Sequence, residues 1–188
     1  MRDFMKLLRT LHIYTSMFGL LILLFFAITG FTLNHADWFG KPVSREITGK
    51  LDPAILKEPD KLAVAEAIRR QFHVSGLVAD FTVSDDSCSV EFRRPGGSAH
   101  ALIDRETGEA HVTLDDDGAV ALLNALHQGR DSGAGWSLLI DIVAWLMVFV
   151  SISGLVLLFS LPKRRGLGLI AMVVGLAICV AVYWICVP

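Results

Sequence analysis

Three long apolar runs constrain the fold of this chain more than any other feature of its sequence. They cover residues 10–34, 135–161 and 167–187, and Asp141 is the only formally charged residue within them. About 20 apolar residues are enough to cross the hydrocarbon core of a bilayer as a helix. Soluble domains carry roughly a quarter of charged residues, whereas this chain carries 19%. We therefore predict a membrane protein with three transmembrane helices.

A cleaved signal peptide is the alternative interpretation of the first apolar run, because basic residues precede it. Its apolar part is longer than the core of about 7–15 residues that signal peptides have, and no convincing small-residue cleavage site ends it. We expect this segment to be retained as a membrane anchor.

The lysines and arginines near the apolar runs predict the orientation. Residues 1–9 carry three of them, and the short turn over residues 162–166 carries three more. Short basic loops stay in the cytoplasm, whereas long segments cross the membrane largely regardless of charge. We predict that both basic stretches are cytoplasmic and that residues 35–134 are periplasmic. The chain would then be a multi-pass protein of the bacterial inner membrane, in contact with the lipid bilayer.

The polar segment over residues 35–134 predicts one small α+β domain between the first and second transmembrane helices. The expected elements are a helix capped by Asp60 with Leu62, Ala65, Ile68 and Phe72 on one face, strands over 77–83, 89–92, 99–103 and 110–114, and a short helix over 119–126. Residues 36–134 hold 11 bases and 17 acids, which gives a net charge of 11 − 17 = −6. A domain with this negative charge lacks the basic surface that binds nucleic acids, so we predict no nucleic-acid partner.

Three of the six histidines lie at the ends of the apolar runs, and they are the main candidates for binding a cofactor. His12 begins the first run and His35 follows its end, so about 34 Å of helix separates them. His127 precedes the second run. The predicted topology therefore brings His35 and His127 to the same membrane surface, where we expect them to meet. The other three histidines are expected to be ordinary surface or strand residues of the domain.

The pair His35 and His127 predicts a haem b site. Neutral imidazoles bind haem iron axially, and an apolar slot between helices holds the porphyrin. An interfacial histidine is also tolerated without a ligand, because water and headgroups satisfy it. His12 has no histidine partner at its own surface, so a second copy of the chain, another subunit or a methionine would have to pair with it. Arg130 is expected to pair with a haem propionate or with lipid headgroups.

Several motifs in the apolar runs and beside them resemble a known family. They are Leu11-His12, Gly19, Thr29-Gly30 and Leu33-Asn34-His35 in the first run, and Leu126-His127-Gln128-Gly129-Arg130 and Ser153-Gly154-Leu155 around the second. Together they look like the helices of PepSY-associated transmembrane proteins. The segment with Asp104–Gly108 and Glu109–Val112 is similar to a PepSY domain.

The resemblance implies a redox function. Larger members of this family are haem-containing inner-membrane reductases that act on ferric siderophores in the periplasm, which implies that His12, His35 and His127 are haem ligands. It also implies a place in a membrane oxidoreductase, although this chain is shorter, with three spans and one outer domain. Other relatives accompany flavoproteins outside the cytoplasm, and PepSY units also occur as inhibitory modules of protease propeptides.

Two functions therefore stay open. The first is haem b electron transfer to periplasmic ferric iron, a siderophore or a flavoprotein, with quinol or a partner redox subunit as the donor. The second is a membrane-anchored PepSY module that binds or regulates a partner without a redox cofactor. No nucleotide-binding glycine motif, hydrolase motif or catalytic residue is found in the sequence.

Overall fold

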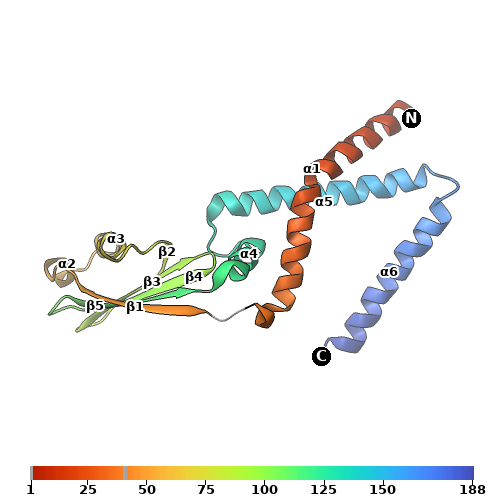
Figure 1. Ribbon diagram of the computed structural model, residues 1–188. Coiled ribbons are helices and arrows are strands. Elements are labelled where there is room, and N and C mark those ends of the chain that lie inside the picture. The colour runs from red at the N-terminus through yellow and green to blue at the C-terminus, as the bar shows by residue number, and fades with distance from the viewer. Residues whose placement is uncertain (1, 40–41) are drawn as a thin grey trace. The chain divides into compact units, whose positions relative to one another are not determined.

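Three long helices dominate the computed structural model, which describes residues 2–39 and 42–188. They are α1 (Arg2–Asn34), α5 (Gly133–Phe159) and α6 (Arg165–Cys186), shown in Figure 1. Each is long and apolar enough to cross a membrane. The prediction of three transmembrane helices is confirmed at this level.

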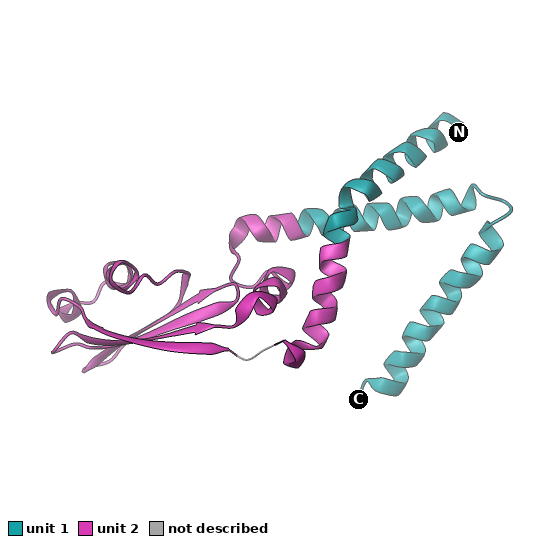
Figure 2. Ribbon diagram, in the orientation of Figure 1, with its two compact units in different colours: residues 1–23, 141–188 teal, residues 24–140 magenta. Residues whose placement is uncertain are grey.

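The chain forms two compact units, which Figure 2 shows in different colours. One comprises Met1–Leu23 with Asp141–Pro188, and the other comprises Leu24–Ile140. His12 therefore belongs to the first unit, whereas His35 and His127 belong to the second.

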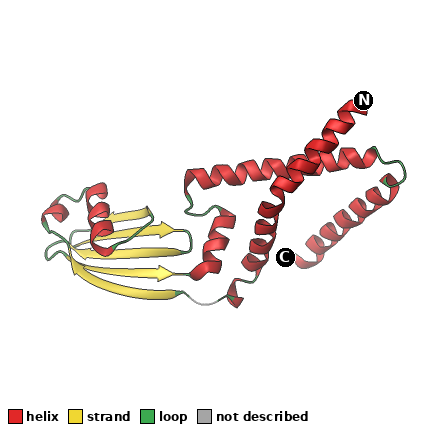
Figure 3. Ribbon diagram, turned by 45° about the horizontal axis from the view of Figure 1, so that its top comes forward, coloured by secondary structure: helices red, strands yellow, loops and turns green. Residues whose placement is uncertain are grey.

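The second unit contains a five-stranded antiparallel sheet with short helices, as Figure 3 shows. Its elements are the 3-10 helix η1 (Ala36–Trp38), β1 (Val43–Lys50), α2 (Ala54–Lys57), α3 (Lys61–Phe72), β2 (Leu77–Val83), β3 (Ser87–Arg94), β4 (Gly97–Asp104), β5 (Glu109–Asp116) and α4 (Gly118–Gln128). The strand order is β1-β5-β4-β3-β2. All four pairs are antiparallel, so tight hairpins join β2 to β3, β3 to β4 and β4 to β5.

The predicted strands and the two longer helices of this domain are confirmed. Helix α3 begins after Asp60, whose carboxylate accepts the backbone N–H of Ala63 at 2.9 Å. Strand β1 and the four-residue helix α2 were not predicted. The sequence of β1 is mostly polar and holds Gly49, and as an edge strand it is defined by its pairing with β5 rather than by an apolar pattern.

The core lies on one face of the sheet, under α2 and α3. Its fully buried side chains are Leu56, Val64, Ile68, Val90, Phe92, Ala101, Ile103 and Val112, and Cys88 is buried among them. Leu62 was predicted on the buried face of α3, but its side chain is 68% exposed, and Val64 takes that place in the core. The buried face of α3 is centred on Val64, Ile68 and Phe72, and Leu62 lies outside the edge of that face.

The opposite face of the sheet carries mainly polar side chains. His100 and His111 lie there on β4 and β5, and His73 follows α3 with a positive φ of 54°. The interpretation of these three as surface or strand residues is confirmed. His100 contacts Ser89 through its Nε2 atom at 3.1 Å.

Arg105, in the β4–β5 turn, hydrogen-bonds to two other segments of the domain, the end of α2 and the β2–β3 turn. Its guanidinium donates to the backbone carbonyls of Leu56 and Lys57 at 3.0 Å each and to those of Ser84 and Asp85 at 2.7 and 3.0 Å. A planar guanidinium suits such divergent acceptors because its donors point in fixed directions. This side chain therefore fixes α2 against the β2–β3 turn.

We predict that Ile68→Ala destabilises the domain by about 2–5 kcal/mol, because the fully buried side chain leaves a cavity. Leu62→Ala on the same helix should change stability by no more than about 0.5 kcal/mol. The measurement is the urea concentration at which Cys88 in the full chain becomes open to alkylation, followed by peptide mass spectrometry. Equal midpoints for the two variants would contradict this description of the core.

The hydrogen bonds of the β4–β5 turn predict that the stability of the domain depends on pH. The Asp104 carboxylate accepts the N–H groups of Glu106 and Thr107 at 3.0 and 2.8 Å and the Thr107 hydroxyl at 2.9 Å. These hydrogen bonds, those of Thr107 first, lower the pKa of Asp104. A carboxyl whose folded pKa is lowered stabilises the fold above its unfolded pKa of about 3.9, and this effect is lost as the pH falls through the lower folded value.

Asp104→Asn should therefore reduce the loss of urea resistance that the domain suffers on acidification below about pH 4. Asp86→Asn is the control, because this exposed turn residue makes no side-chain hydrogen bond among the described residues. A pH profile of Asp104→Asn identical to that of the unaltered chain would show that the turn does not contribute.

Candidate functional site

A buried hydroxyl on α1 holds His127. The Oγ1 atom of Thr29 lies 2.6 Å from Nδ1 of His127, and Thr29 is only 1% exposed. The ring of Phe26 meets the imidazole edge to face, with 5.0 Å between centroids. Gly30 leaves room at the same place, because a Cβ atom there would lie 3.6 Å from Cε1 of His127. His127 therefore packs against one turn of α1.

We infer the tautomer of His127 from the surroundings of Thr29. The Thr29 hydroxyl has one hydrogen, and the backbone carbonyls of Phe25 and Phe26 lie 2.7 and 3.3 Å from its oxygen. When this hydrogen goes to Phe25, the hydroxyl accepts from the imidazole and Nδ1 of His127 carries the proton. The Nε2 atom then keeps its lone pair for a ligand.

A second pair of side chains meets one turn further along. The Thr32 hydroxyl oxygen lies 2.6 Å from Oδ1 of Asn124 and 2.9 Å from the backbone carbonyl of Thr29, and Asn124 is 9% exposed. Thr29 and Thr32 are three residues apart on α1, as are Asn124 and His127 on α4, so both pairs lie on facing sides of the two helices. Trp136 at the start of α5 donates from Nε1 to the carbonyl of Leu126 at 2.7 Å and fixes the end of α4.

His12 is held in the same way within the other unit. Its Nδ1 atom lies 2.7 Å from Oγ of Ser153, which donates to the carbonyl of Val150 at 3.1 Å. A Cβ atom on Gly154 would come within 3.3 Å of Cε1 of His12. By the argument used for Thr29, a Ser153 hydroxyl that donates to Val150 leaves the proton on Nδ1 of His12 and Nε2 free. A hydroxyl residue thus contacts Nδ1 of both His127 and His12, and a glycine follows it in the sequence.

His35 has a different environment. Its Nδ1 atom donates to the carbonyl of Phe31 at 3.1 Å, one turn earlier on the same helix. The ring packs against Trp38 and Phe31, with centroids 4.0 and 4.6 Å away. Because a carbonyl can only accept, Nε2 is free in this histidine too.

His35 and His127 were expected to meet, but no contact joins them among the described residues. His35 lies one residue beyond the end of α1, and its ring packs against Phe31 and Trp38. His127 lies on α4, and its ring packs against Phe26 and Thr29 of α1. The pairing of the two histidines on one iron stays a prediction.

Arg130 lies in the turn between α4 and α5. Gly129 ends α4 in the left-handed conformation with a φ of 68°, and Asp131 also has a positive φ of 54°. The side chain of Arg130 lines a cavity and makes no hydrogen bond or ion pair with another side chain in the described ranges. Its expected role at a haem propionate stays a prediction.

The side chains that hold the histidines were not predicted in that role. The sequence signal is a hydroxyl residue directly before glycine, Thr29-Gly30 and Ser153-Gly154, inside otherwise apolar helices. A polar side chain within an apolar helix needs a hydrogen-bond partner, which is the property that could have identified them.

The three histidines do not form a metal cage. Within residues 2–39 and 42–188, no three His, Cys, Asp or Glu side chains gather around one point. An imidazole that binds haem iron needs a free Nε2 and usually donates its other N–H to an oxygen of the protein. The Nδ1 atoms of His12, His35 and His127 lie 2.7, 3.1 and 2.6 Å from such an oxygen.

Comparison with known proteins gives one match. The family model for PepSY_TM-like proteins matches residues 6–188, nearly the whole chain. No curated protein and no solved structure gives a significant match.

Proposed function

The chain belongs to the PepSY_TM-like family, and we propose that it is a haem b-binding electron-transfer protein of the inner membrane. The observation that carries this proposal is the environment of His127, whose Nδ1 atom lies 2.6 Å from the buried Thr29 hydroxyl, a contact that supports the tautomer in which Nε2 is free for a ligand. When bound, haem b supplies a one-electron redox couple.

The protein's part in this chemistry is to orient and tune the imidazole. A hydrogen bond from Nδ1–H to an oxygen fixes the ring orientation and raises the basicity of the opposite nitrogen. Thr29 does this for His127, and Ser153 does it for His12. The apolar ring of Phe26 against His127 keeps water away from one side of the imidazole.

The second axial ligand is open to direct test. His35 supplies an imidazole with a free Nε2 in the same unit as His127, and it lies one residue beyond the end of α1. In this proposal His35 pairs with His127 on one iron, and His12 pairs with a ligand from a second copy or from a partner redox subunit.

The proposed topology follows from the charges around the spans. Residues 1–9 and 162–166 are basic and would stay in the cytoplasm. The PepSY-like α+β domain between the first and second spans would then face the periplasm. Its acidic surface, with a net charge of 11 − 17 = −6 over residues 36–134, would meet a periplasmic acceptor such as ferric iron, a siderophore or a flavoprotein.

The test of the proposal is the visible spectrum of the chain purified in detergent after expression with added haem. We expect Soret and α bands in the reduced-minus-oxidised spectrum, and we expect His127→Ala to remove or shift them. His100→Ala is the matched control, because this histidine lies on the sheet and uses Nε2 toward Ser89. A colourless preparation would contradict the haem proposal and favour a binding or regulatory PepSY module.

The same spectra assign the second ligand. Loss of the bands in His35→Ala as well as in His127→Ala would show that both histidines bind one iron. Bands that survive His35→Ala but not His127→Ala would place the second ligand elsewhere.

Thr29→Val should weaken haem binding by about 10–100-fold, because a ligand loses the oxygen that orients it. Thr29→Ser keeps the hydroxyl and should bind haem nearly as well as the unaltered chain. Haem titration of the apoprotein measures both. Equal affinities for Val and Ser at this position would show that the hydroxyl plays no part.

A further inference from the structure

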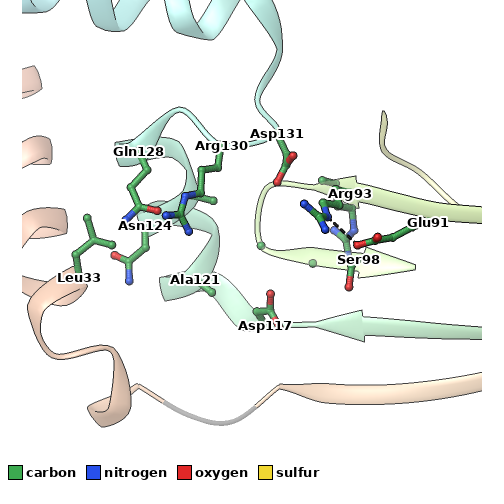
Figure 4. A pocket seen from close by; sticks show the side chains of 14 residues that line it. Leu33, Glu91, Arg93, Ser98, Asp117, Ala121, Asn124, Gln128, Arg130 and Asp131 are labelled. Carbon is green, nitrogen blue, oxygen red and sulfur yellow. Dashed lines mark hydrogen bonds and ion pairs between the residues drawn. The ribbon is translucent and has the colours of Figure 1, made fainter. Parts of the chain in front are cut away.

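A polar cavity lies where the ends of two transmembrane helices meet the domain. Its volume is about 660 Å³, and Figure 4 shows the side chains that line it. Leu33 contributes from the last turn of α1, the turn between β3 and β4 contributes Gly96 and Gly97, and α4 contributes Asn124. This volume is within the range of about 300–1,000 Å³ that small-molecule sites have.

The cavity combines both signs of charge. On the side of the cavity that the β3–β4 hairpin forms, Arg93 is paired with Glu91 at 2.7 Å. Arg94 also lines it and is paired with Asp116 at 3.6 Å. Arg130, Asp117 and Asp131 line it too, and these three make no side-chain hydrogen bond or ion pair within the described part of the chain. The hydrogen bond to Glu91 and its negative charge and, more weakly, the negative charge of Asp131 raise the pKa of Arg93. One guanidinium and two carboxylates are therefore without a directly bonded partner.

A nearly buried amide lies among the lining residues. Asn124 is 9% exposed, and its Oδ1 atom lies 2.6 Å from the Thr32 hydroxyl oxygen. The guanidinium of Arg130 offers donors that suit a phosphate. Asp117 and Asp131 offer acceptors that suit an ammonium group.

The position of the cavity sets the kind of ligand. Leu33 is one residue from the end of α1, and α5 begins at Gly133, two residues after Asp131. Trp136 lies in the first turn of α5, at the depth where tryptophan commonly marks the membrane surface. Phospholipid headgroups lie at this depth.

We propose that this cavity binds the zwitterionic phosphoethanolamine headgroup of a phospholipid, with its phosphate on Arg130 and its ammonium group on Asp117 and Asp131. A haem propionate is a weaker fit, because the two free carboxylates would repel it. A choline headgroup lacks the N–H donors that these carboxylates need. The assignment does not depend on haem binding.

Native mass spectrometry of the full chain in detergent tests the proposal with three lipids of the same acyl chains. The headgroups are phosphoethanolamine, phosphocholine and phosphoglycerol. We expect the phosphoethanolamine lipid to bind most strongly and Arg130→Gln to weaken it by roughly tenfold, as the loss of one charge-assisted hydrogen bond implies. Arg45→Gln is the control, because Arg45 is equally exposed but lies on β1 outside the cavity.

The double variant Asp117→Asn with Asp131→Asn should remove the preference for phosphoethanolamine over phosphocholine. Asparagine tolerates the positive φ of position 131, so the turn is preserved. Soluble phosphoethanolamine at millimolar concentration should displace the lipid only weakly, since it lacks the acyl chains. Tight binding of the soluble compound without binding of the lipid would overturn the assignment to a membrane lipid.

Two further results would overturn the proposal. One is equal binding of the three lipids by the unaltered chain. The other is a loss of haem absorbance in Arg130→Gln with unchanged lipid binding, which would assign Arg130 to a propionate instead. A chain that binds no haem but keeps the phosphoethanolamine preference would contradict the proposed function and leave this inference intact.

Discussion

One buried hydroxyl joins the first apolar helix of this protein to the helix that carries the proposed ligand. Thr29 on α1 lies within hydrogen-bond distance of a carbonyl of its own helix and of His127 on α4, so a single side chain satisfies its own polar group and orients an imidazole. In an apolar helix an unpaired hydroxyl is costly, and a free imidazole beside it would be equally so. The pair solves both problems and leaves one nitrogen for a ligand.

The same kind of contact occurs a second time. Ser153 lies 2.7 Å from Nδ1 of His12, and a glycine follows the hydroxyl residue in the sequence in both places. In the proposed function both histidines use Nδ1 for the hydroxyl and keep Nε2 for a ligand, which is the arrangement expected of metal ligands.

The sequence predicted the elements that have strong local signals. The apolar runs, the helix after Asp60 and the strands of the central hairpins all have such signals. Strand β1 was missed because its pairing with β5, rather than its own pattern, defines it. Leu62 was assigned to the core because periodicity gives a face of a helix but not where the edge of that face lies.

The candidate site was predicted only as a set of residue types. Chain order placed His35 and His127 at one membrane surface, but the direction of each side chain depends on how the helices pack, which spacing alone does not give. The partners Thr29 and Ser153 are distant in sequence from the histidines they hold, by 98 and 141 residues. Such pairings arise only when the helices pack, and the charged lining of the cavity beside Arg130 arises in the same way.

The tautomer of His127 is the most direct test of this account. Nitrogen NMR of the haem-free full chain, labelled with ¹⁵N-histidine and assigned by the missing signals of His127→Gln, reports which ring nitrogen carries the proton. The account predicts a protonated Nδ1 and a bare Nε2. A proton on Nε2 would contradict it, because the imidazole would then present no lone pair to a metal.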